Sequence, residues 1–211
     1  MSEQIDLKVL EKRAWRSAYQ DGIWDIYFGL LFLGMAFAPL GETIDSPSEL
    51  GIILILVPWY SIAVLILMLG KKFITIPRIG FVKFGAKRKK VKKTLLGLLI
   101  FNVILALLFF IVDIGGLFTF LNIEGLAQPL VIGLFLITVP LSILAYFLEY
   151  HRLYGYATFF GFSFFSSELL YPLVGSPLDL MLSQGSVGIV AMIIGLIYLV
   201  QFLRKYPLSQ K

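Results

Sequence analysis

Six apolar segments, separated by short polar stretches, account for most of this chain. Their approximate bounds are residues 23–40, 51–70, 95–114, 129–148, 153–174 and 186–203. A helix rises about 1.5 Å per residue, so crossing the ~30 Å hydrocarbon core of a bilayer takes about 20 apolar residues. The pattern therefore predicts an all-α, polytopic membrane protein with six transmembrane helices.

The polar stretches join these spans into three helical hairpins. The predicted order is an amphipathic cytoplasmic lead-in helix (1–22), hairpin 1 (23–70), a basic cytoplasmic loop (71–94), hairpin 2 (95–150), hairpin 3 (151–205) and a cytoplasmic tail (206–211). Residues 27–41 and 159–175 both begin with an aromatic residue followed by Phe and Gly. The first stretch ends in Pro-Leu-Gly and the second in Pro-Leu-Val-Gly. Hairpins 1 and 3 are therefore either a repeat or two apolar segments that are alike by chance.

The distribution of charge indicates how the protein is oriented. The stretch 71–93 contains ten Lys or Arg and no acid, and such residues are retained on the cytoplasmic side. If both termini are inside and the spans alternate, all 18 Lys and Arg of the chain fall on the inner side. The outer side then carries acids alone, namely Glu42, Asp45, Glu49, Asp113, Glu124, Glu168 and Asp179. We therefore expect an N-in/C-in protein of the cytoplasmic membrane.

The composition of the chain argues against several classes of function. Hydrophobic residues make up 59% of the chain and charged residues 15%, whereas a soluble domain has about 25% charged residues. The net charge of +5 is explained by membrane topology, so nucleic acid is not expected as a partner. The chain has no Cys, which excludes disulfides and cysteine metal sites, and it lacks the HExxH, Walker A and GxSxG patterns. We expect no enzymatic activity, no metal and no cofactor.

Glu168 is the most informative single residue, because it lies inside the fifth predicted span. An ionisable residue in a span is costly and by default marks a functional site that faces the bundle interior. Ser163 and Ser167 lie on the same helix, and Asp113 and Asn102 of the third span are candidates for the same polar interior. The alternative is structural: Glu168 hydrogen-bonds a neighbouring helix or reaches the outer interface.

Two carboxylates, Asp21 and Asp25, are spaced i, i+4 at the start of the first span. An acid at this place meets the positive end of the helix dipole. The alternatives are pairing with Arg16 or with the basic loop, and a docking or proton site.

Small residues line one side of the last span. Gly188, Ala191 and Gly195 recur at helical spacing, and small residues let transmembrane helices approach closely. We expect this face to pack against a neighbouring helix.

The basic loop is the candidate contact for anionic lipid or for a partner, since clusters of Lys and Arg beside a span bind anionic headgroups. Its candidate contact residues are Lys83, Lys87, Arg88, Lys89, Lys90, Lys92 and Lys93. The alternative is that these residues serve only as the topological anchor. The sequence thus favours a non-enzymatic multi-pass protein that engages anionic lipid, a cytosolic partner or a second copy of itself. The alternative function is a small-solute or ion transporter or channel with Glu168 in its path.

Overall fold

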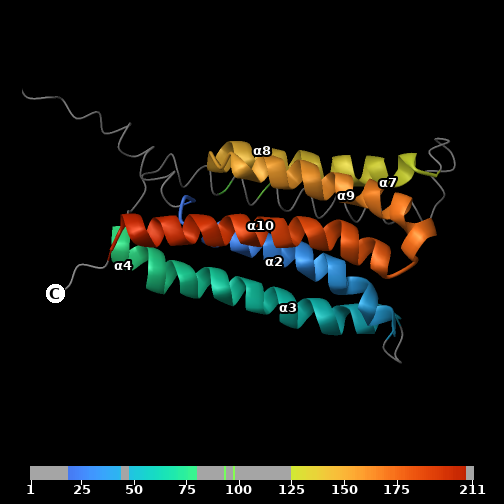
Figure 1. Cartoon of the computed structure of the whole chain (residues 1–211), viewed down its shortest axis with the longest axis horizontal. Helices are drawn as coiled ribbons and strands as arrows, with labels where there is room; N and C mark the ends of the chain where they lie inside the picture. The colour runs from blue at the N-terminus through green and yellow to red at the C-terminus, as the bar shows by residue number, and fades with distance from the viewer. Residues whose placement is uncertain (1–18, 44–47, 80–92, 94–96, 98–124, 208–211) are drawn as a thin grey trace, which may run out of the picture.

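In a computed structural model, the chain is described at residues 19–43, 48–79, 93, 97 and 125–207. Within these residues all regular structure is helical, and the long helices run side by side along one direction (Figure 1). The predicted all-α fold is confirmed for this part of the chain. Most of the predicted lead-in helix, of the third span and of the basic loop lies outside the described residues.

The first hairpin consists of two long helical runs. Its elements are α2 (Ile23–Phe37), the 3-10 helix η1 (Ala38–Thr43), α3 (Ser48–Gly70), the π-helix η2 (Lys71–Thr75) and α4 (Ile76–Ile79). The chain enters α2 through Gly22, whose φ of 77° is a left-handed conformation that glycine adopts readily. The helix that begins at Ser48 continues without interruption through Ile79. The stretch predicted as a loop from residue 71 therefore begins as nine further residues of helix.

The second half of the described chain is a run of three long helices. Its elements are α7 (Ala127–Ile132), the π-helix η3 (Gly133–Thr138), α8 (Val139–Leu148), α9 (Arg152–Val174) and α10 (Leu178–Lys205). Glu149, at φ 54°, ends α8 in a left-handed conformation, and Gly175, at φ 70°, ends α9. The start of α10 corrects the predicted start of the last span at residue 186. Asp179 lies in its first turn, where the helix dipole favours an acid.

Within the described residues, four helical segments are long and apolar enough to cross a membrane. They are Ile23–Gly41, Leu50–Ile79, Ala127–Leu148 and Leu178–Lys205. They contain the first, second, fourth and sixth predicted spans, so the described helices agree with the prediction of a membrane protein in their length and composition. The fifth predicted span is the 23-residue helix α9, which is less apolar because it carries serines and Glu168. The number of spans and their orientation stay predictions.

The bundle is organised around the contact of α2 with α10. A Cβ atom added to Gly29 would lie 2.8 Å from the carbonyl oxygen of Gly188, and one added to Gly22 would lie 2.1 Å from that of Gly195. Both distances are too short for a real Cβ, so these glycines let the two backbones touch. The expectation that the small-residue face of the last span packs against a neighbour is confirmed, and the neighbour is α2. Figure 1 shows α3 on one side of this pair and α8 with α9 on the other.

Candidate functional site

One end of the bundle brings together four parts of the chain that are far apart in sequence. These are the start of α2, the π-helix η2, the turn between α8 and α9, and the end of α10 (Figure 1). We call it the basic end and define it by its charged residues, which are Asp21, Asp25, Lys71, Lys72, Arg78, Glu149, Arg152, Arg204 and Lys205. Two of its carboxylates are fully buried, which is unusual enough to make this end the candidate site.

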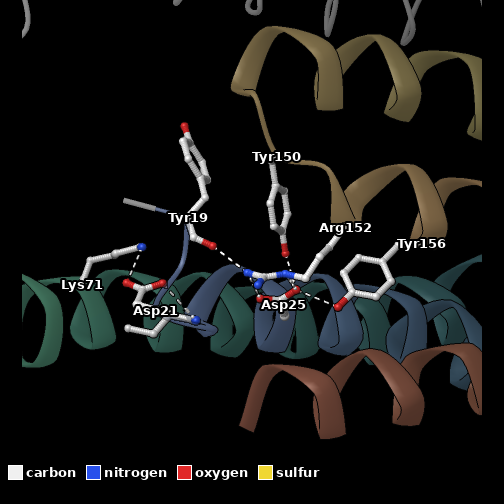
Figure 2. Close-up of polar contacts among 8 residues, drawn as sticks. Tyr19, Asp21, Asp25, Lys71, Tyr150, Arg152 and Tyr156 are labelled. Carbon is white, nitrogen blue, oxygen red and sulfur yellow. Dashed lines mark hydrogen bonds and ion pairs between the residues drawn. The ribbon is translucent and has the colours of Figure 1, made fainter. Parts of the chain in front are cut away.

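The carboxylate of Asp25 is the centre of a buried polar network (Figure 2). Its Oδ1 accepts hydrogen bonds from Arg152 Nε at 2.9 Å, from the Tyr156 hydroxyl at 2.6 Å and from the Tyr150 hydroxyl. Its Oδ2 accepts from Arg152 Nη2 at 2.8 Å, and Nη2 also donates to the carbonyl oxygen of Tyr19 at 2.7 Å. The carboxylate is therefore both neutralised and fully hydrogen-bonded.

Local structure explains why these groups meet. Arg152 is the first residue of α9, and Tyr156 lies one turn later on the same face. Tyr150 lies in the turn before α9. Its burial, and the nearby Asp25 carboxylate, raise the pKa of the Tyr150 phenol, so its hydroxyl stays a proton donor. The guanidinium carbon of Arg152 also lies 3.8 Å from the centre of the Tyr198 ring, a cation–π contact with α10. The network thus joins α2, the α8–α9 turn, α9 and α10.

A second carboxylate, Asp21, joins α2 to the end of the other hairpin helix. It is fully buried, and its Oδ2 lies 2.6 Å from Lys71 Nζ and accepts a hydrogen bond from the Thr75 hydroxyl. Its Oδ1 accepts from the backbone N–H of Ile23 at 3.2 Å. Lys71 and Thr75 are the first and last residues of the π-helix η2, a rare form that often marks functional positions. The widened turn brings both side chains to one carboxylate.

The structure shows which bases the two helix-start acids contact. Asp25 lies in the first turn of α2, as the helix-dipole interpretation expects, and both acids also pair with a base. Asp21 binds Lys71, the first residue of the stretch predicted as the basic loop. Asp25 binds Arg152, a partner that we did not predict. Arg16, the other suggested partner, lies outside the described residues.

Three residues of the predicted intramembrane site lie in the part of the chain that the structure describes. Glu168 is exposed on α9, and its role stays a prediction. Ser163 and Ser167 are buried, and their hydroxyls donate to carbonyl oxygens of their own helix, at 2.6 and 2.8 Å. Asp113 and Asn102 lie outside the described residues.

The candidate lipid-contact residues lie almost wholly outside the part of the chain that the structure describes. Lys93 is described and is exposed. The others, which are Lys83, Lys87, Arg88, Lys89, Lys90 and Lys92, are not described. Their role stays a prediction.

The tyrosines and Arg152 are what sequence reasoning missed. From the sequence, Arg152 was counted only as an inner-side charge, and Tyr150 and Tyr156 were not singled out. A usable signal was present, because Arg152 opens a span with Tyr150 two residues before it and Tyr156 four residues after it. Spacing of this kind places three hydrogen-bond donors on one helix start.

Two hollows adjoin Arg152. A groove of about 510 Å³ lies between α9 and α10, and a smaller pocket of about 200 Å³ is lined by residues 19, 20 and 149–152. Across the described ranges, no group of His, Asp and Glu side chains is arranged to hold a metal ion. Comparison with models of known families, with curated proteins and with solved structures found no match for this chain.

Proposed function

We propose that the chain is a non-enzymatic, multi-pass protein of the cytoplasmic membrane that binds anionic lipid at its basic end. The observation that supports this is an imbalance of exposed charge. Asp21 and Asp25 are buried and paired, whereas Lys72, Arg204 and Lys205 are exposed. Glu149 is half-buried there. The exposed charge of this end is therefore mostly positive.

The physical basis is the negative potential of an anionic leaflet. Each Lys or Arg near such a surface contributes about 1 kcal/mol of attraction, which falls off within a Debye length. The predicted basic loop, residues 71–94, would add further positive charge at the same end. In the proposal the chain has six spans, both termini lie in the cytoplasm, and the basic end faces the inner leaflet.

We prefer lipid binding to transport through Glu168. The Glu168 carboxylate lies on the exposed side of α9, and the groove between α9 and α10 is lined by other residues. No described residue favours a cytosolic partner over lipid.

Lipid binding is tested by neutralising the exposed bases of the basic end. The triple variant Lys72→Gln, Arg204→Gln, Lys205→Gln should retain less phosphatidylglycerol than the wild type in native mass spectrometry. The difference should shrink as ionic strength rises, because the attraction is screened. A charge-preserving control exchanges Lys for Arg and Arg for Lys at the same three positions. Equal retention by the neutral variant and this control would refute the proposal.

Orientation is tested by single cysteines, since the chain has none of its own. Ser46→Cys should react with a membrane-impermeant maleimide added to intact cells, and Val91→Cys should react only after the cells are opened. Labelling of Val91→Cys from outside would show that the basic loop is not cytoplasmic.

A further inference from the structure

The groove between α9 and α10 has an apolar wall and a polar end. Its apolar wall includes Phe159, Val187, Val190 and Ile194, and Arg152 lies at one end of it. It opens at the surface of the bundle, since the side chains of Phe159 and Val190 are 68% and 53% exposed. Its volume of about 510 Å³ lies within the range of small-ligand sites, about 300–1,000 Å³.

Two small residues, Gly155 of α9 and Ser186 of α10, are part of the lining of the groove. A Cβ added to Gly155 would meet nothing within 4 Å, so there is open space beside this glycine. The helix α10 is long and apolar enough to cross a membrane, and in the proposed arrangement lipid, not water, surrounds this wall of the groove. An empty groove at that depth would forfeit dispersion contacts on every lining atom. The molecule that surrounds a span and fits a long apolar groove is a lipid acyl chain.

The polar end of the groove supplies what a headgroup needs. Arg152 lines both the groove and the polar pocket of residues 19, 20 and 149–152, so the two hollows adjoin at its side chain. That side chain is 22% exposed although it is paired with Asp25. His151 and Gln20 line the pocket and can donate hydrogen bonds to a phosphate, while Glu149 can accept from an amine. The pocket therefore contains groups for both parts of a zwitterionic headgroup.

We propose that the groove binds one phospholipid, with an acyl chain between α9 and α10 and the phosphate beside Arg152. This rests on the proposed function, because it requires the basic end to lie at the membrane surface. Binding in the groove should depend less on the charge of the lipid headgroup than binding at the basic end. Since Asp25 balances Arg152 and the pocket carries Glu149, the site should accept phosphatidylethanolamine and phosphatidylglycerol alike.

The test fills the groove and titrates lipid into the purified full chain in mild detergent. Gly155→Leu and Val190→Phe place bulk in the groove, and Leu196→Phe places the same bulk on exposed α10 surface outside it. In native mass spectrometry, both groove variants should bind the first phosphatidylethanolamine about tenfold more weakly than the wild type, a factor that corresponds to ~1.4 kcal/mol. The control should bind as the wild type does.

The outcomes separate this inference from the function it rests on. Neutralising Lys72, Arg204 and Lys205 should weaken phosphatidylglycerol binding and leave phosphatidylethanolamine binding unchanged. Wild-type binding by folded Gly155→Leu or Val190→Phe would overturn the groove site alone, whatever the basic end does. Equal weakening by the Leu196→Phe control would also overturn it. If the groove variants lost dimerisation and not lipid binding, the groove would be a contact with a second copy of the chain, and the lipid site would be overturned.

Discussion

The buried ion pair of Asp25 and Arg152 should contribute strongly to the stability of the basic end. We expect Arg152→Gln to lower the free energy of unfolding by about 3 kcal/mol, the lower part of the range for breaking a buried ion pair. The reason is that Asp25, which is 0% exposed, would keep only the hydroxyls of Tyr150 and Tyr156 as donors. We expect a smaller loss of about 2 kcal/mol for Asp25→Asn, because the Arg152 side chain is 22% exposed and can still be solvated.

A double-mutant cycle measures the coupling of the two side chains. The double variant should lose only about 3 kcal/mol, since the second substitution removes a group whose partner is already gone, which leaves a coupling of about 2 kcal/mol. The assay is reversible unfolding by SDS from mild detergent, followed by tryptophan fluorescence. Lys72→Gln, at an exposed base of the same end, is the control and should not couple to Asp25→Asn. Losses that add to within ~0.5 kcal/mol would refute the pairing as a stabilising contact.

Three further predictions use the same assay. Lys71→Met should lower the free energy of unfolding by about 3 kcal/mol, because it removes the base that pairs with the fully buried carboxylate of Asp21. Lys72→Met, at the exposed neighbouring position, should change it by less than ~0.5 kcal/mol, and equal losses would contradict the pairing. Gly29→Ala should lower the free energy of unfolding by about 2 kcal/mol, since the new Cβ would lie 2.8 Å from a carbonyl oxygen of α10. Gly155→Ala, whose Cβ would meet nothing within 4 Å, should leave the free energy of unfolding unchanged or raise it by up to ~1 kcal/mol. Glu168→Leu should change stability by less than ~0.5 kcal/mol, and a loss of several times that amount would show that this carboxylate has buried partners.

The sequence predicted the helices well and their ends poorly. Apolar runs of about 20 residues mark a membrane span whatever the neighbouring helices are. The continuation of a helix beyond the span has no such mark, because a polar helical turn has the same composition as a loop. Residues 71–79 and 178–185 were therefore expected to be loops, and the structure makes them helical.

The candidate site was predicted in part, and the missing part is tertiary. The i, i+4 spacing of Asp21 and Asp25 already marked the start of α2 as unusual. Their partners were not predictable, since Arg152 is 127 residues from Asp25 and nothing local links them. For Glu168, the sequence indicated how far along the predicted span the residue lies, but not toward which side of the helix its side chain points. Successive residues on a helix point about 100° apart, so the exposed face is known only once the neighbours are placed.

The long separation of Asp25 from Arg152 gives assembly an order in time. At a synthesis rate of about 5–20 residues per second, roughly 6–25 s pass between the two residues. During that interval α2 has neither its base from α9 nor the glycine-lined surface of α10 against which it packs. The helix α2 therefore reaches its final place only when α10 has been made. A chain cut short before α9 would leave the Asp25 carboxylate without its Arg152 partner and the glycine face of α2 uncovered.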